Sequence, residues 1–242
     1  MIGAVRFHLY DVLSKRSRLV LGGFSILVGL IFLALTRLNM STTERLLSGT
    51  SFSDDYLFEG LIIIKTIALM LVAFCGIRLW FYAAGDLVLV QRIGRVKLTL
   101  SKTVAAWLIV WVMTTFYILL FWLIGTLFGI DFYRFSLWSL WWRMSVFVLY
   151  YVVLSGALAV LLGHVFSQLG VIFGWFMADV LVDMGFDAST TTLPALLMNA
   201  AFLNIHVNQA WQLTMMMHGV YIIGITIVWF MLTIAHVMHR DF

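Results

Sequence analysis

Long uninterrupted apolar runs, separated by short polar segments, are the dominant pattern of this chain. A bilayer core about 30 Å thick is crossed by a helix of roughly 20 apolar residues. The runs lack the alternation, in segments of about ten residues, that is typical of a membrane β-barrel. The pattern therefore predicts an all-α integral membrane fold with one transmembrane domain over 1–242. The six predicted spans are 19–36, 61–84, 103–128, 144–162, 169–182 and 220–235, of which the fifth is the shortest.

The segment 2–14 precedes the first span and carries its own apolar stripe at helical spacing. This stripe consists of Ile2, Val5, Leu9, Val12 and Leu13. We expect His8 and Asp11 to lie away from the stripe. The basic run that begins at Lys15 would then lie near lipid phosphates. We predict a helix lying in the inner membrane interface, and the alternative is a cytosolic extension of the first span.

The distribution of charged residues predicts how the chain is oriented in the membrane. Hydrophobic residues make up 63% of the chain and charged residues 11%, against roughly a quarter charged in soluble domains. If the amino terminus is inside, most basic residues are cytosolic, as the positive-inside rule requires. The cytosolic set is Arg6, Lys15, Arg16, Arg18, Arg92, Arg95, Lys97, Lys102 and Arg240, and the outer set is Arg37, Arg45, Arg134 and Arg143. Both termini are predicted to be cytosolic, in the cytoplasmic membrane of a bacterium. Because topology explains the net charge of +4, we expect no nucleic-acid partner.

Two cations, Lys65 and Arg78, fall inside the second predicted span. Charges within a membrane span indicate an ion path by default. Each lies only a few residues from a membrane face, however, so we predict that both side chains snorkel to the interface. Cys75 is the single cysteine, which excludes an intrachain disulfide and a cysteine metal site.

Tryptophans gather before the fourth span, where Trp138, Trp141 and Trp142 lie between Arg134 and Arg143. Such a cluster is typical of the aromatic belt at a membrane interface. The alternative is a tryptophan-rich site for an amphipathic substrate.

Two glycine pairs have the four-residue spacing that permits close approach of membrane helices. Gly125 and Gly129 form the first pair, and Gly170 and Gly174 form the second, in the short fifth span. The second pair is the candidate dimer face.

The segment 183–219 between the last two spans is irregular. Pro194 stands at a position suited to the first turn of a helix, and the apolar stretch 195–203 is too short to cross the membrane. We predict a re-entrant hairpin on the outer side, whose irregular backbone is covered by protein or water. A seventh span would place His236 and Arg240 outside, against the charge rule.

The segment 85–102 is the longest predicted cytosolic connection. Asp86 opens a short apolar stretch, 87–90, that suits an amphipathic helix. We expect a break at Gly94 and a second helix that enters the membrane through Lys102. The alternative is a basic loop that only fixes topology.

This order of an acidic residue, a short apolar helix, a turn, an arginine and a membrane-entering lysine resembles the coupling loop of ABC exporter permeases of the type V architecture. An interfacial amino-terminal helix, six spans and a broken outer hairpin between the fifth and sixth spans are also similar to that family. Members often carry glutamate where Asp86 stands and a proline where this chain has Ile93-Gly94.

The resemblance implies a permease half that pairs with a separate ATP-binding subunit, which would hold ATP and Mg²⁺. The chain has no GxxxxGK[ST] phosphate loop, so we expect it to bind no cofactor and to be no enzyme itself. Its cations would pair with acidic groups of the partner or hold lipid phosphates. The predicted coupling residues are Asp86, Gln91, Arg92, Arg95, Lys97 and Lys102.

Two such halves would line one pathway, so the resemblance also implies a second copy or a sister permease. Scattered polar points in the mostly apolar spans are the candidate cargo-lining residues, and they suit an amphipathic peptide, lipid-like molecule or drug better than a small ion. These residues are Thr114, Thr115, Tyr117 and Ser155.

Two other classes of function remain open at this point. An intramembrane hydrolase would need a nucleophile beside a base, but Ser155 and His164 are separated by about 13 Å along a helix. We therefore predict no catalytic and no metal-binding residues. A channel or structural membrane subunit is the other class, and unlike an exporter half it would not co-purify with an ATPase.

Overall fold

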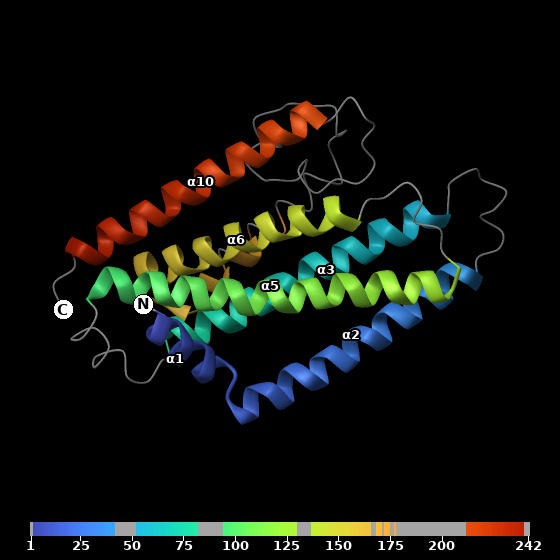
Figure 1. Ribbon diagram of the computed structural model, residues 1–242, viewed down its shortest axis with the longest axis horizontal. Helices are drawn as coiled ribbons and strands as arrows, with labels where there is room; N and C mark the ends of the chain where they lie inside the picture. The colour runs from blue at the N-terminus through green and yellow to red at the C-terminus, as the bar shows by residue number, and fades with distance from the viewer. Residues whose placement is uncertain are drawn as a thin grey trace.

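A computed structural model describes residues 2–41, 52–81, 94–129, 137–165, 168–170, 172–174, 177 and 212–239. Every regular element in these ranges is helical, and five helices are long and apolar enough to cross a membrane (Figure 1). The chain is therefore an all-α, multi-pass membrane protein. The elements are α1 (Ile2–Val12), α2 (Lys15–Ser41), α3 (Phe52–Gly76), the π-helical turn η2 (Ile77–Phe81), α5 (Arg95–Leu127), α6 (Leu137–Leu162) and α10 (Gln212–His239).

The five long helices correspond to five of the six predicted spans, and each begins before its predicted limit. Thus α5 begins at Arg95, eight residues before its predicted span, because the helix predicted after Gly94 continues into that span. The predicted span 169–182 lies largely outside the described residues, and the predicted hairpin 183–219 is described only from Gln212, where α10 begins. The count of six spans and the hairpin therefore stay predictions.

The helices lie roughly side by side, and α2, α3, α5 and α6 alternate in direction (Figure 1). Helices α6 and α10 run the same way, so the chain between them has to return from one end of the bundle to the other. The described chain begins and ends, at Ile2 and His239, at one end of the bundle, which we call the terminal end. The membrane face at this end stays a prediction.

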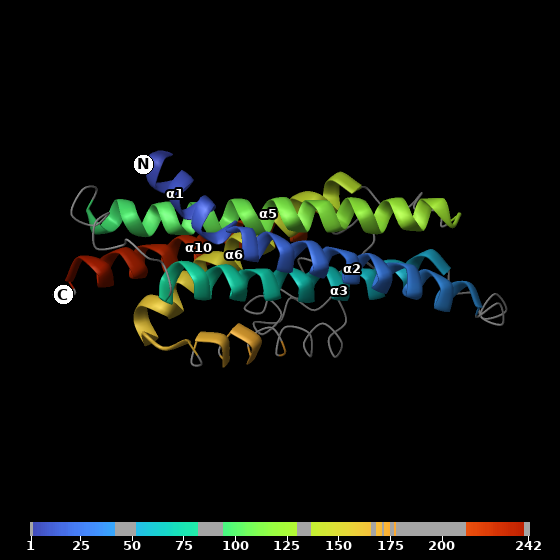
Figure 2. The same cartoon turned by 90° about the horizontal axis from the view of Figure 1, so that it is seen from below.

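Helix α1 crosses the first turns of α5 at an angle (Figure 2) and also contacts η2. It buries Ala4, His8 and Val12, whereas Ile2 is 85% exposed. The predicted register of its apolar stripe was therefore wrong, since His8 faces the protein. The reason is that α1 packs against helices, and close helix packing favours the row spaced by four residues that contains the small Ala4.

The core lies between α3, α5 and α6. In the apolar windows of α3 and α6, 67% of the residues are buried, against 22% in α2 and α10. Helices α2 and α10 therefore form the two margins of the bundle, and the described parts of the chain leave broad apolar faces of both uncovered. Such faces suit lipid or another membrane chain.

At the end opposite to α1, aromatic rings join α2, α3 and α5. Tyr56 stacks on Phe121 with ring centroids 4.6 Å apart, and Phe32 meets the same ring edge-on at 5.3 Å. Gly60 lies against Phe121 so closely that an added Cβ would lie 2.1 Å from the ring. We call Phe32, Tyr56, Gly60 and Phe121 the distal cluster, and its density makes it a fixed point of the fold.

Candidate functional site

The last turn of α3 becomes the π-helical turn η2 at the terminal end of the bundle. A π turn arises where one extra residue is accommodated in a helix, and such turns are frequent at functional sites. Residues 82–93 of the chain between η2 and α5, which include most of the predicted coupling loop, lie outside the described residues. The side chains of η2 are therefore the described ones that directly precede this segment.

Arg78 on η2 contacts α1. Its Nη2 lies 3.7 Å from Oδ1 of Asp11 and donates to the Asp11 carbonyl oxygen at 3.3 Å. The two side chains are 34% and 22% exposed. The predicted snorkelling of Arg78 to the membrane interface stays a prediction, and the structure adds Asp11 as its protein partner. Lys65, which we also predicted to snorkel, is only 2% exposed and lies inside the bundle, because α3 is buried on most sides.

Trp80 on η2 contacts α5 and α6. The Lys102 Nζ lies 5.2 Å from the centroid of the Trp80 ring, which is a cation–π distance. On the other side Gly156 of α6 leaves room for the ring, since an added Cβ would lie 3.0 Å from its Cζ2. We call Asp11, Arg78, Trp80, Lys102 and Gly156 the terminal junction, which connects η2 to α1, α5 and α6.

The predicted coupling residues differ in burial, and some of them lie outside the described residues. Lys102 is 3% exposed, so it can take part in coupling only through its neighbours. Lys97 is exposed and Arg95 is half-buried at the start of α5. The predicted break at Gly94 is confirmed, because this residue has φ 79°, which favours glycine, and α5 begins directly after it. Asp86, Gln91 and Arg92 lie outside the described residues.

The predicted cargo-lining residues lie at contacts between different helices. The Tyr117 hydroxyl is 3.0 Å from the Ser25 hydroxyl on α2, and Thr115 accepts a hydrogen bond of 3.1 Å from Trp141 Nε1 on α6. Thr114 is buried at 2% exposure. The fourth residue, Ser155, faces the segment that follows α6. The four do not converge on one cavity within the described chain, and their role in cargo binding stays a prediction.

Sequence reasoning missed the buried polar contact that involves Ser155. Helix α6 ends before Gly163, with φ 65°, and the chain then turns so that Gln168 reaches back to α6. The Gln168 Nε2 donates to Oγ and to the carbonyl oxygen of Ser155 at 2.6 and 2.8 Å. Gly76 on α3 makes the space, because an added Cβ would lie 2.5 Å from Ser155 Oγ. The sequence signal for this contact was a single glutamine, Gln168, within an apolar run.

The predicted dimer face, Gly170 and Gly174, is exposed, and no heavy atom lies within 4 Å of a Cβ added at either position. An uncovered small-residue face is what a helix partner would need. Its use in a dimer stays a prediction.

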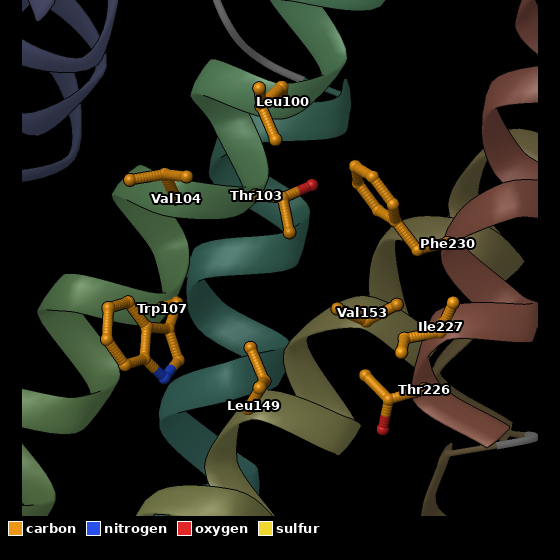
Figure 3. A pocket seen from close by; sticks show the side chains of 9 residues that line it. All are labelled: Leu100, Thr103, Val104, Trp107, Leu149, Val153, Thr226, Ile227 and Phe230. Atoms are coloured by element: carbon orange, nitrogen blue, oxygen red, sulfur yellow. The ribbon is translucent and has the colours of Figure 1, made fainter. Parts of the chain in front are cut away.

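A groove lies between α5, α6 and α10 in the half of the bundle nearer the terminal end (Figure 3). Its volume is about 220 Å³. The side chains of α5 and α10 face one another across it, and α6 forms its floor. The lining residues are Leu100, Thr103, Val104, Trp107, Leu149, Val153, Thr226, Ile227 and Phe230.

The tryptophans predicted as an interfacial belt differ in their surroundings. Trp138 at the start of α6 is 70% exposed, as a belt residue would be. Trp141 instead turns toward α5, where its ring lies 5.7 Å from that of Trp111. Trp111 in turn stacks on Trp107 of the groove at 5.8 Å. Aromatic rings thus follow the contact between α5 and α6 from the start of α6 to the groove.

Comparisons with family models, curated proteins and solved structures found no match for this chain. Within the described ranges, no group of three or more His, Cys, Asp or Glu side chains could hold a metal ion.

Proposed function

We propose that this chain is the membrane-spanning half of an ATP-driven exporter of the type V ABC architecture. It would pair with a separate subunit that binds ATP and Mg²⁺, and with a second copy or a sister permease. The observation that carries the proposal is the terminal junction, because it connects the segment next to the predicted coupling loop with three other helices. The resemblance of segment 85–102 to a coupling loop supports the same conclusion.

In this proposal, closure of the ATP-binding partner displaces the coupling loop, and η2 transmits the displacement. Arg78 would carry it to α1 through Asp11, and Trp80 would carry it to α5 and α6 through Lys102 and Gly156. A partly exposed ion pair contributes about 0–1 kcal/mol, and a cation–π contact contributes roughly 0.5–2 kcal/mol. Contacts of this strength can exchange during each cycle without unfolding the bundle.

The partner would meet the protein at the terminal end. Arg95 at the start of α5, with Arg92 in the loop, would face acidic groups of the ATP-binding subunit. Such peripheral charges change association rate and orientation more than affinity. This placement requires the terminal end to be cytosolic, in the cytoplasmic membrane of a bacterium, as the positive-inside rule favours.

Cargo would pass between two permease halves and not through one bundle. The uncovered apolar faces of α2 and α10 support such an association, because they leave much surface for a second membrane chain. The mostly apolar spans favour an amphipathic peptide, a lipid-like molecule or a drug as cargo.

Purification of the tagged chain from its native cells in mild detergent tests the proposal. We expect a stoichiometric nucleotide-binding subunit and ATP hydrolysis that is lost when Mg²⁺ is chelated. A single polypeptide, reproducibly free of ATPase under conditions that keep other membrane complexes intact, would contradict it.

A channel is the second candidate, and the burial of Lys65 favours it. A cationic side chain that is 2% exposed within a membrane span is a feature of ion pathways. This function would appear as ion flux into liposomes that contain the purified chain alone, and Lys65→Met would abolish the flux. An exporter half would show no such flux.

A further inference from the structure

The groove of Figure 3 is apolar and opens to the outside of the bundle. Its walls are Leu, Val, Ile, Phe and Trp side chains with two threonines, Thr103 and Thr226. Each threonine hydroxyl donates to a carbonyl of its own helix, at Thr99 and Ile222. Ile227 on α10 is 55% exposed, so the groove is accessible between α5 and α10. Apolar cavities of this kind stay dry and accept apolar molecules.

The groove suits a narrow apolar occupant. Its space of about 220 Å³ lies along α5, and α10 and α6 supply its other side chains. A single flexible hydrocarbon chain is an occupant of this kind.

The groove lies near the terminal end of the predicted span on α5. It extends from Leu100 to Trp107, and Lys97 lies one turn nearer the terminal end. Because the predicted span begins at residue 103, Lys97 lies about 9 Å outside the hydrocarbon core, at the level of lipid headgroups. An acyl chain that enters beside Lys97 would therefore follow the groove into the first turns of the span.

Lys97 supplies a charge at the entrance. It is three residues before Leu100, so the two side chains lie on neighbouring positions of one helix face. Lys97 is exposed, and no ion pair involves it in the part of the chain that the structure describes. A lysine at the interface beside an apolar groove between membrane helices suits an anionic lipid headgroup.

We propose that the groove binds one acyl chain of an anionic phospholipid from the leaflet at the terminal end, with the lipid phosphate at Lys97. The chain of the lipid lies along Leu100, Val104 and Trp107 and is covered by Ile227 and Phe230. The site does not depend on the exporter proposal, since a channel or structural subunit with the same bundle would bind the same lipid.

Native mass spectrometry of the purified full chain tests this site. The protein is stripped of lipid in detergent and titrated with phosphatidylglycerol or phosphatidylcholine of the same acyl chains. We expect one phosphatidylglycerol to be retained, with an affinity about fivefold above that of phosphatidylcholine. Lys97→Glu is expected to remove this preference for phosphatidylglycerol. Ile227→Trp, which fills the mouth of the groove, is expected to weaken the binding of both lipids.

Two matched variants serve as controls. Lys15→Glu makes the same charge change at the start of α2, away from the groove. Val228→Trp adds the same ring at the next position of α10, where Val228 is also 55% exposed but does not line the groove. Both controls are expected to bind like the parent. Equal retention of the two lipids by the parent, or parental binding by Ile227→Trp, would overturn the proposal.

Discussion

The two ends of this helix bundle are joined by different kinds of contact. At the distal cluster, Phe121 packs between Tyr56 and Phe32, and all three side chains are at most 1% exposed. At the terminal junction, Arg78 and Asp11 form a pair that is partly exposed. Any change of distance weakens the tight aromatic packing of the distal cluster. The ion pair of the terminal junction can instead be replaced by contacts with water or with another charged group.

This difference indicates which end moves. Tight aromatic packing has one favourable arrangement, so the distal cluster would hold α2, α3 and α5 together through a transport cycle. The contacts of η2 are individually weak and lie beside the predicted coupling loop. A force applied at the terminal end would therefore rearrange η2 and its neighbours around a fixed distal end.

Phe121→Ala should have the largest effect on stability. It removes the central ring of the distal cluster and leaves a cavity between three helices, at a cost of about 3–5 kcal/mol. Unfolding in a detergent titration measures this loss. Phe116→Ala on the same helix is the control, because Phe116 is 48% exposed, and it should cost far less. Equal losses in the two variants would show that the distal cluster is not the fixed end.

Gly76→Ala should have an intermediate effect. The added Cβ would displace Ser155 Oγ and Gln168 Nε2 from their hydrogen bond, at a cost of about 1–3 kcal/mol. Gly23→Ala on α2 is the matched control, since no atom lies within 4 Å of its added Cβ. If both variants unfold like the parent, the contact between Gln168 and Ser155 contributes nothing to the fold.

Asp11→Asn should have the smallest effect on stability and a clear effect on coupling. A partly exposed pair contributes under about 1 kcal/mol, so the unfolding midpoint should barely move. The ATPase activity of the assembled complex should lose its response to cargo, because α1 is no longer held to η2 by charge. An unchanged response would remove the ion pair from the coupling path and leave the hydrogen bond of Arg78 to the Asp11 carbonyl and the contacts of Trp80 as the remaining connections.

The apolar pattern predicted the helices well, because a membrane span must satisfy its backbone internally and so requires a long apolar run. It placed the start of α3, at Phe52, nine residues too late, since polar turns carry no hydropathy signal. The break at Gly94 could be predicted because glycine marks a special backbone conformation. The burial of His8 and the pairing of Arg78 with Asp11 could not be predicted, because both depend on which helices become neighbours.

The contacts of the candidate site also depend on which helices become neighbours, so the sequence alone could not predict them. The groove combines α5, α6 and α10, and no local pattern brings Trp107 and Ile227 together. Gln168 and Gly76 are likewise distant in sequence, and their contact follows from the turn at Gly163. Sequence alone indicated the loop with its cations, which is a local feature, but not η2 as the element that connects it to the bundle.

The ATPase activity of the co-purified complex with Arg92→Glu and Arg95→Glu combined tests whether segment 85–102 couples this chain to an ATP-binding partner. We predict that the helices still insert and that the ATP-binding partner no longer associates or is no longer stimulated. Lys15→Glu with Arg16→Glu, which changes the same charge outside the loop, should leave the activity at the parental level. Parental association and stimulation in the loop variant would contradict the account.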